Sequence, residues 1–262
     1  MDYKTIKFDL RDGVAHLTLN RPDAANAISL ELSQELYDAM LRCDEDRAVR
    51  AVLIAGSGKM FCAGGDLKAF ATRKDDLGAH LKLLTHFIHG AVSLMAHMDA
   101  PVIAAVNGTV AGGGLGLVFG ADLVIAAESA RFTMAYTRAG LSPDASTSFF
   151  LPRLVGLRRA LDLTLTNRVL SAREAMEWGI VNRVVPDAEL ATASDGLVRE
   201  IADGATAAFG VSKRLLRESF SDTLETHLQA EARAIAERSR SAEAREGISA
   251  FLEKRAPRYR GM

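Results

Sequence analysis

Short apolar runs alternate with longer segments of mixed polarity over the first two thirds of the chain. The pattern predicts buried strands, because each run is short, apolar and bounded by turn residues. These runs are residues 14–19, 51–55, 102–106 and 123–126. Ser29 is a typical N-cap before apolar residues at helical spacing, and residues 77–97 form a second helical pattern. Strands alternating with helices predict an α/β fold with mostly parallel strands.

The pattern changes after about residue 187. Apolar residues such as Leu215, Leu228 and Ile248 then stand among many charged residues, without a clear strand pattern. This predicts amphipathic helices whose apolar side covers either their own core or a neighbouring subunit. We therefore divide the chain into a core at residues 1–195 and a C-terminal helical region at residues 196–262.

Two glycine-rich stretches each follow a predicted strand: FCAGGDL at residues 61–67 and NGTVAGGGLG at residues 107–116. Each leads into a predicted helix, so some backbone N–H groups would be left for a ligand. Two such turns brought together would aim two N–H groups at one oxygen, as in an oxyanion hole. Close packing at an ordinary strand–helix turn is the alternative that the residues leave open. The glycine spacing completes neither a dinucleotide-binding motif nor a P-loop.

Composition and charge exclude several classes of protein. The chain has 262 residues, 48% of them hydrophobic, and a net charge of −1, which argues against a nucleic-acid or anionic-membrane partner. Two cysteines are a poor disulfide framework, and a reducing, cytoplasmic location fits them best. We expect no signal peptide and no membrane span, because no apolar stretch is long enough.

Six motifs in a fixed order carry a resemblance over nearly the whole chain. They are LTLNRPDAANAIS, FCAGGDL, PVIAAVNGTVAGGGLGLVFGADLVIAAESARF, GLSPDASTSFFLPRLVG, LTNRVLSAREAMEWGIVNRVV and REGISAFLEKRAPRY. In these the chain resembles the crotonase (enoyl-CoA hydratase/isomerase) superfamily. The resemblance implies an α/β fold, a crotonase-like spiral of ββα units with a C-terminal helical trimerisation region. It also implies a homotrimer or a dimer of trimers.

The resemblance implies an acyl-CoA thioester as substrate, with coenzyme A as part of that substrate and no other cofactor or metal. The thioester oxygen would lie between the N–H groups of Gly65 and Gly113. Contacts with the substrate or its coenzyme A would come from two regions of the chain. They are Ala24, Ala63, Gly65, Asp66, Leu67, Lys68 and Gly113 in the core, and Phe251 and Lys254 near the C-terminus. From the residues alone, Phe251 is a helix-packing residue and Lys254 a solvated charge.

The acid–base groups depart from the hydratase pattern. Hydratases of the family use two glutamates, and their positions are Gly116 and Tyr136 here. Water addition needs acid and base groups, so the sequence disfavours efficient hydration. The remaining candidate is Asp144, which follows a proline and is, from local sequence, a typical helix N-cap. The resemblance instead implies a catalytic aspartate, because related isomerases carry one in a similar GLxPD context. We expect Met134, Tyr136, Phe149 and Phe150 to form an apolar pocket around it.

A second set of positions is similar to the 4-chlorobenzoyl-CoA dehalogenases of the superfamily. His89 falls where those enzymes place a histidine base, and Tyr136 where a tryptophan holds the aspartate. An ordinary surface or core histidine is the alternative for His89. Gly65 departs from the bulky aromatic residue of the dehalogenases, and the C-terminal motif is more similar to phenylacetyl-CoA-pathway isomerases.

These observations favour an enoyl-CoA isomerase in which Asp144 shuttles a proton on a thioester enolate. The alternatives are dehalogenase-type hydrolysis of a halobenzoyl-CoA with Asp144 and His89, and a divergent enoyl-CoA hydratase. A non-catalytic, RNA-binding or scaffolding role would need a concentrated basic face, which the net charge of −1 does not favour. Isomerases of this kind act on the thioester itself, so we expect neither a metal nor a redox cofactor.

Overall fold

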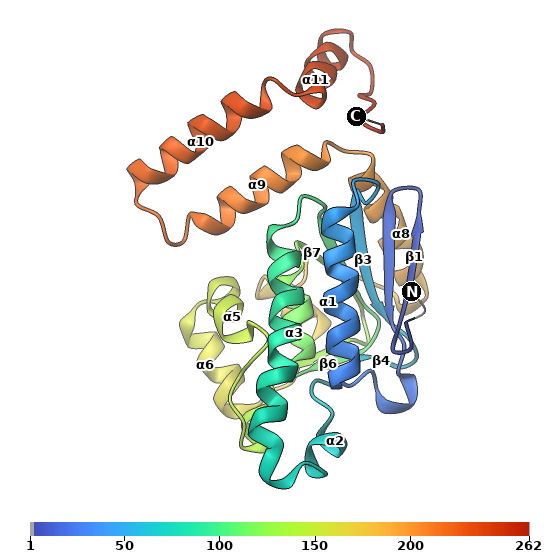
Figure 1. Ribbon diagram of the computed structural model, residues 1–262, viewed down its shortest axis with the longest axis vertical. Helices are drawn as coiled ribbons and strands as arrows, with labels where there is room; N and C mark the ends of the chain where they lie inside the picture. Colours follow the sequence, from blue (N-terminus) through green and yellow to red (C-terminus); the bar gives the residue numbers. More distant parts are fainter. Residues whose placement is uncertain (1–2, 262) are drawn as a thin grey trace.

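The computed structural model describes residues 3–261, and its centre is a six-stranded sheet in the order β1-β2-β3-β5-β7-β10 (Figure 1). The first two strands are antiparallel and all later neighbours are parallel. The strands are β1 (Ile6–Arg11), β2 (Val14–Leu19), β3 (Ala51–Gly56), β5 (Val102–Val106), β7 (Leu123–Ala127) and β10 (Arg183–Val185). All five residues of β5 are buried, as expected for a central strand covered on both faces.

A second sheet of four short strands runs in the order β4-β6-β8-β9. They are β4 (Met60–Cys62), β6 (Thr109–Ala111), β8 (Arg131–Thr133) and β9 (Leu170–Ser171). Each of β3, β5 and β7 in the first sheet is followed directly by β4, β6 or β8 in the second, and then by helix. This repeated ββα order is the spiral that the sequence resemblance implied.

Helices cover both faces of the six-stranded sheet. On one side α1 (Leu30–Glu45) and α3 (Leu77–His97) run next to each other, and their apolar faces complete the main core (Figure 1). On the other side α8 (Leu190–Ala202) packs on β3, β5 and β7 over a smaller core. The remaining helices of the core are α2 (Leu67–Ala71), α4 (Gly114–Gly120), α5 (Thr147–Val155), α6 (Leu157–Thr166) and α7 (Ala172–Glu177). Four 3-10 turns occupy Pro22–Ala24, Lys74–Asp76, Thr137–Ala139 and Asp187–Glu189.

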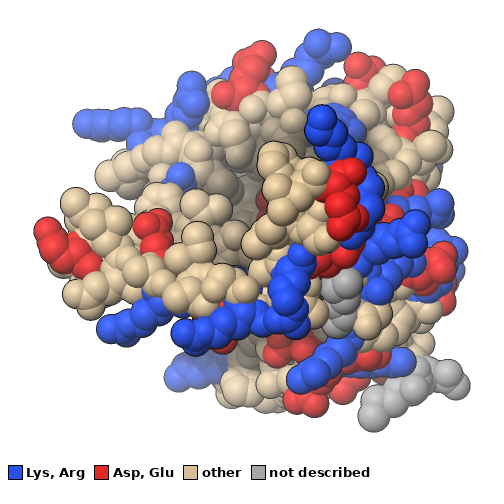
Figure 2. Space-filling model, turned by 90° about the horizontal axis from the view of Figure 1, so that it is seen from above, with Lys and Arg blue, Asp and Glu red and all other residues tan. Residues whose placement is uncertain are grey.

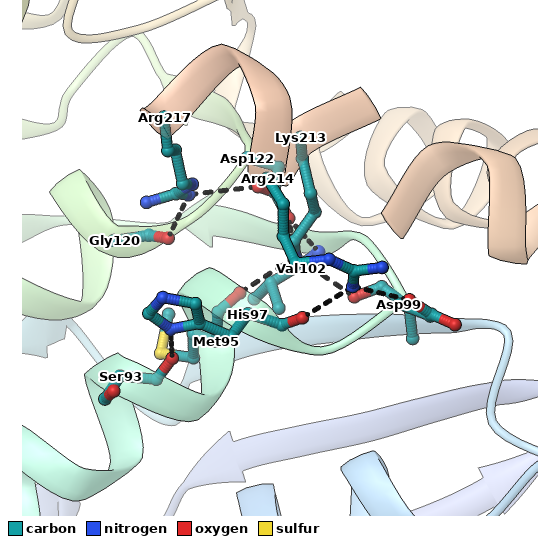
Figure 3. Close-up of polar contacts among 11 residues, drawn as sticks. Ser93, Met95, His97, Asp99, Val102, Gly120, Asp122, Lys213, Arg214 and Arg217 are labelled. Atoms are coloured by element: carbon teal, nitrogen blue, oxygen red, sulfur yellow. Dashed lines mark hydrogen bonds and ion pairs between the residues drawn. The ribbon is translucent and has the colours of Figure 1, made fainter. Parts of the chain in front are cut away.

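Three C-terminal helices extend beyond this core: α9 (Thr206–Glu218), α10 (Leu224–Arg238) and α11 (Ala242–Leu252) (Figure 1). A buried ion pair joins α9 to the core, because Lys213 Nζ lies 2.8 Å from Asp122 Oδ2 and 2.8 Å from the carbonyl oxygen of Met95 (Figure 3). Arg217 donates to the other oxygen of the same carboxylate at 3.0 Å. Asp122 therefore holds two successive turns of α9 against the ends of α3 and α4.

The apolar side of these helices is exposed within a single chain. Leu224 of α10 is 69% exposed, Ile235 of α10 is 73% and Phe251 of α11 is 82%. Figure 2 views the molecule from this end and shows basic and acidic side chains interspersed around a central hollow. The division at residue 195 stays a prediction, and residue 195 itself lies within α8.

Most of the predicted elements are present. Strands β2 and β5 and helix α3 have the predicted bounds, and Ser29 caps α1 by accepting a hydrogen bond from the N–H of Leu32 at 3.2 Å. The glycine-rich stretches differ from the prediction in one respect: each includes all or part of a short strand, β6 or β4, before its turn. Among residues 3–261, no helix is long and apolar enough to cross a membrane.

Candidate active site

Parallel pairing of β4 with β6 brings the two glycine-rich turns together. Cys62 lies opposite Val110 in this pair, and Gly65 and Gly113 are each the third residue beyond. Because the carboxyl ends of parallel strands meet at one edge of a sheet, both turns begin at the same edge. The two glycine-rich turns therefore lie together, which is the condition that an oxyanion hole built from both of them requires.

The two turns touch through glycines that no other residue could replace without strain. Gly64 has φ +87° and Gly112 has φ +49°, which lie in the left-handed region that favours glycine. A Cβ atom on Gly64 would lie 2.8 Å from the carbonyl oxygen of Ala111, the last residue of β6 before the opposite turn. The close approach of Gly64 and Gly112 sets the positions of the next residues, Gly65 and Gly113.

The backbone N–H groups of Gly65 and Gly113 are free to bind a ligand. Among the described residues, neither donates a hydrogen bond to another protein atom. Both glycines line a cavity of about 230 Å³, which Tyr136 and Asp144 also line. A Cβ atom at position 65 would lie 2.7 Å from the ring of Phe70, so a side chain there would require that ring to move.

Asp144 lies beside the second of these glycines. Its Oδ1 atom is 3.5 Å from the place that a Cβ atom on Gly113 would occupy. The same oxygen accepts a hydrogen bond of 2.7 Å from the hydroxyl of Tyr136. Burial raises the pKa of Tyr136 above its ordinary value, and the charge of Asp144 raises it further. Tyr136 is therefore a protonated donor that holds the carboxylate.

The N-cap interpretation of Asp144 is wrong. Helix α5 begins at Thr147, its N-cap position is Ser146, and no side chain caps it. The backbone carbonyl of Asp144, rather than its carboxylate, accepts from Thr147, at 2.9 Å from N and 2.8 Å from Oγ1. The carboxylate instead accepts the hydrogen bond from Tyr136 and lines the cavity.

Two consecutive residues in left-handed conformation follow Asp144. Ala145 has φ 48° and Ser146 has φ 65°, although neither is glycine. Such residues persist only where the surroundings impose the conformation, and they are frequent at functional sites. Ala145 packs directly on Gly116, where a Cβ atom would come within 2.7 Å of the Ala145 Cβ. The backbone of this turn thus fills the space next to the position at which hydratases carry a glutamate.

His89 contacts this turn and not the carboxylate. From α3, its Nε2 atom accepts a hydrogen bond of 3.1 Å from the N–H of Ala145. Its ring lies on the wall of a second, larger cavity of about 790 Å³, which α3, α5 and α9 enclose. Asp144 lines both cavities, so it stands at the boundary between them.

The expected apolar pocket is only partly confirmed. Tyr136 lines the smaller cavity, whereas Phe149 and Phe150 line the larger one, and Met134 lines neither. The sequence did not indicate the actual apolar wall beside Gly65, which is formed by Ile28, Phe70, Leu84 and Ile88. Leu84 and Ile88 are buried on α3, four residues apart. Such a spacing indicates an inward-facing side of a helix, but it does not indicate a cavity.

The expected coenzyme A contacts in the core lie around the same turn. Ala63 and Leu67 line the smaller cavity, Ala24 ends the first 3-10 turn, and Lys68 is exposed in α2. Asp66 caps α2 through the N–H of Ala69 and forms an ion pair of 2.9 Å with Arg21. Burial opposes its ionisation, but these two partners together lower the pKa of Asp66 below the ordinary value. Arg21, which the motif contained without a predicted role, thus fixes the turn from outside.

The C-terminal candidates are far from this cavity within one chain. Phe251 and Lys254 lie at and just beyond the end of α11, whereas α2 is at the opposite end of the molecule (Figure 1). Neither residue lines either cavity. Their contact with coenzyme A stays a prediction.

The comparisons with known proteins agree with this architecture. Residues 9–262 match the family model described as Enoyl-CoA hydratase/isomerase. The chain belongs to the enoyl-CoA hydratase/isomerase family. It is therefore an acyl-CoA enzyme of that family, and the resemblance seen in the sequence motifs is confirmed.

Relatives in this family carry different reaction names. The chain is 39% identical to 1,2-epoxyphenylacetyl-CoA isomerase of Escherichia coli (strain K12), over 95% of each chain. It is 37% identical to 4-chlorobenzoyl coenzyme A dehalogenase-2 of an Arthrobacter species, over 84% of this chain and 80% of the relative. A solved structure of an enoyl-CoA hydratase from Bacillus anthracis superposes with a TM-score of 0.92 at 34% identity, over 99% of this chain and all of the other.

Proposed function

We propose that this protein isomerises an enoyl-CoA, moving a carbon–carbon double bond from the 3,4 to the 2,3 position. The observation that carries the proposal is the position of Asp144, whose Oδ1 is held by Tyr136 beside Gly113. A single carboxylate next to the donors for a thioester oxygen is sufficient for a proton shuttle. The proposed acyl group is an unsaturated fatty acyl or a ring-derived acyl.

In the proposed mechanism, the thioester oxygen accepts hydrogen bonds from the N–H groups of Gly65 and Gly113. Asp144 removes a proton from C2, and the electron pair moves onto the thioester oxygen as a dienolate. Each preorganised donor contributes about 3–4 kcal/mol to stabilising such a charge. Asp144 then returns the same proton to C4, so that no atom is gained or lost. The thioester supplies the activation, and the mechanism needs no metal or redox cofactor.

The neighbourhood of Gly116 supports isomerisation over hydration. Hydration needs a positioned water between an acid and a base, and the two glutamate positions of hydratases are Gly116 and Tyr136 here. Ala145 lies against Gly116, and the hydroxyl of Tyr136 donates a hydrogen bond to Asp144. A side chain at position 116 would have to displace the turn that presents Asp144.

A second candidate is hydrolysis of a halobenzoyl-CoA. Asp144 would attack the ring carbon that bears the halogen, halide would leave, and water would then hydrolyse the aryl ester. The similarity to the dehalogenase and the Tyr136–Asp144 contact favour this chemistry. The hydrogen bond from Ala145 to His89 weighs against it, because that bond uses the Nε2 lone pair that a water-activating base would need.

We also propose that α9 to α11 mediate assembly into a homotrimer or a dimer of trimers. Large apolar side chains along these helices are exposed in the single chain, and an interface would bury them. The most exposed are Leu216, Phe220, Leu224, Ile235, Phe251 and Leu252. Light scattering coupled to size-exclusion chromatography would give a mass of three or six chains, and a monomer would contradict the proposal.

The function is tested by turnover of a 3-enoyl-CoA to its conjugated isomer, followed by the absorbance of the conjugated thioester. Parallel assays with crotonyl-CoA and 4-chlorobenzoyl-CoA measure hydration and dehalogenation in the same preparation. Isomerisation should be the fastest of the three.

A further inference from the structure

The turn that carries Asp144 depends on a contact from a distant part of the chain. Ala145 and Ser146 are both in the left-handed region, which is unfavourable for residues with a side chain. Local hydrogen bonds hold the carbonyl side of the turn, where the oxygen of Asp144 accepts from Thr147. On the amide side, the N–H of Ala145 has His89 of α3 as its one acceptor among residues 3–261.

The role of His89 follows from which atom it uses. Its Nε2 accepts the hydrogen bond from the Ala145 N–H, so that nitrogen carries no proton and its lone pair is occupied. Ala145 is only 1% exposed, and a buried N–H without an acceptor is unfavourable. The imidazole is therefore an acceptor that stabilises the turn, in the tautomer protonated on Nδ1.

We propose that His89 is a positioning residue: it accepts the Ala145 N–H, maintains the left-handed turn at residues 145–146 and so keeps Asp144 beside Gly113. This inference rests on the proposed function for the catalytic use of Asp144. It assigns His89 a role different from a water-activating base.

Loss of the acceptor should affect the chemical step more than binding. Without it, Ala145 and Ser146 can relax to negative φ, and the carboxylate moves away from the reacting carbons. The backbone donors of Gly65 and Gly113 belong to other turns and are left in place. Misplacement of a reacting group by about 1 Å reduces catalysis by about 100-fold. The effect should therefore appear in kcat, with little change in KM.

Two substitutions separate positioning from general-base catalysis. In His89→Gln the amide oxygen can accept the Ala145 N–H, and we expect kcat to stay within about threefold of wild type. In His89→Leu the side-chain acceptor is lost, and we expect kcat to fall by about 10- to 100-fold at nearly constant KM. The matched control is His86→Leu, one turn earlier on α3, because His86 is exposed and lines neither cavity. It should have wild-type kinetics.

The contradicting outcomes are also distinct. If His89→Gln is as inactive as Asp144→Asn, then His89 acts in proton transfer and the positioning role is wrong. If His89→Leu matches wild type, then the contact has no catalytic importance.

A crystallographic readout separates this inference from the proposed function. In a crystal structure of His89→Gln, the φ angles of Ala145 and Ser146 should be unchanged. In a structure of His89→Leu, both residues should have relaxed to negative φ. Failure of wild type to isomerise any 3-enoyl-CoA would overturn the function while leaving this structural test intact. An unchanged turn in His89→Leu would overturn the inference whatever the reaction is.

Discussion

The hydroxyl of Tyr136 donates a 2.7 Å hydrogen bond to Oδ1 of Asp144, at the boundary between the two cavities. Tyr136 occupies a position at which hydratases of the family carry a catalytic glutamate, and here it orients the carboxylate. The N–H groups of Gly65 and Gly113, for which we propose the stabilisation of an enolate, belong to other turns than Tyr136. We therefore expect the family fold to be kept while the acid–base group differs from that of the hydratases.

Replacing Tyr136 by phenylalanine removes one hydrogen bond and little volume. A hydrogen bond to a charged group contributes about 1.5–3 kcal/mol, so kcat for isomerisation should fall by about 10- to 100-fold. Steady-state kinetics check this. The control is Tyr37→Phe, since Tyr37 packs on Phe87 and is away from both cavities. Unchanged kcat in Tyr136→Phe would mean that Asp144 does not need this donor.

Gly116→Glu should fail to create a hydratase. The new side chain would meet Ala145 and push the turn that carries Asp144. Overpacking of this kind destabilises by about 1–3 kcal/mol, and isomerisation should fall with it. Urea unfolding and a crotonyl-CoA assay measure both effects. In the matched control, Gly196→Glu on α8, a Cβ atom meets nothing within 4 Å, and stability should change much less. Fast hydration by Gly116→Glu would contradict the account of this turn.

The stability that Asp66 contributes to the folded chain, through the turn around Gly65, should depend on pH. Its pKa is lower in the folded chain than in the unfolded chain, so the folded state binds fewer protons. The stability that it contributes is present above the unfolded pKa and is lost as the pH falls through the folded pKa. The stability difference between wild type and Asp66→Asn should be constant above about pH 5 and shrink below about pH 4. Asparagine can still cap α2, so the variant tests the ion pair with Arg21.

Urea unfolding of both proteins between neutral and acidic pH measures this difference. The exposed Asp75, in the second 3-10 turn, provides the control substitution Asp75→Asn. A difference for Asp66→Asn that grows as the pH falls would contradict the assigned ion pair.

The sequence predicted the parts of the fold that depend on local pattern. Strand β5 and helix α3 were identified with their bounds, because an uninterrupted apolar run and a helical repeat are strong local signals. Strands β4 and β6 were missed because three residues give no periodicity, and only pairing across the sheet makes them strands. The ββα spiral came from the resemblance and not from the pattern.

Features of the candidate site that depend on neighbouring residues could be predicted from the sequence, whereas contacts between distant residues could not. The two glycine-rich turns are visible in sequence, whereas the choice of Gly65 and Gly113 as donors came from the resemblance and stays a prediction. Local sequence alone favoured an N-cap role for Asp144, since the left-handed turn at Ala145 and Ser146 cannot be read from alanine and serine. The bond from Ala145 to His89 joins residues 56 positions apart, which no local pattern encodes.

The most direct test of the account is isomerisation of a 3-enoyl-CoA by wild type and Asp144→Asn, measured side by side. Asparagine keeps the shape of the side chain but cannot take the proton from C2. The account predicts rapid conversion by wild type and a loss of about 1,000-fold or more in kcat for the variant, within the range of a lost general base. Equal rates for the two proteins would contradict the proton shuttle. If neither protein is active, the proposed proton shuttle by Asp144 is wrong for simple 3-enoyl-CoA substrates.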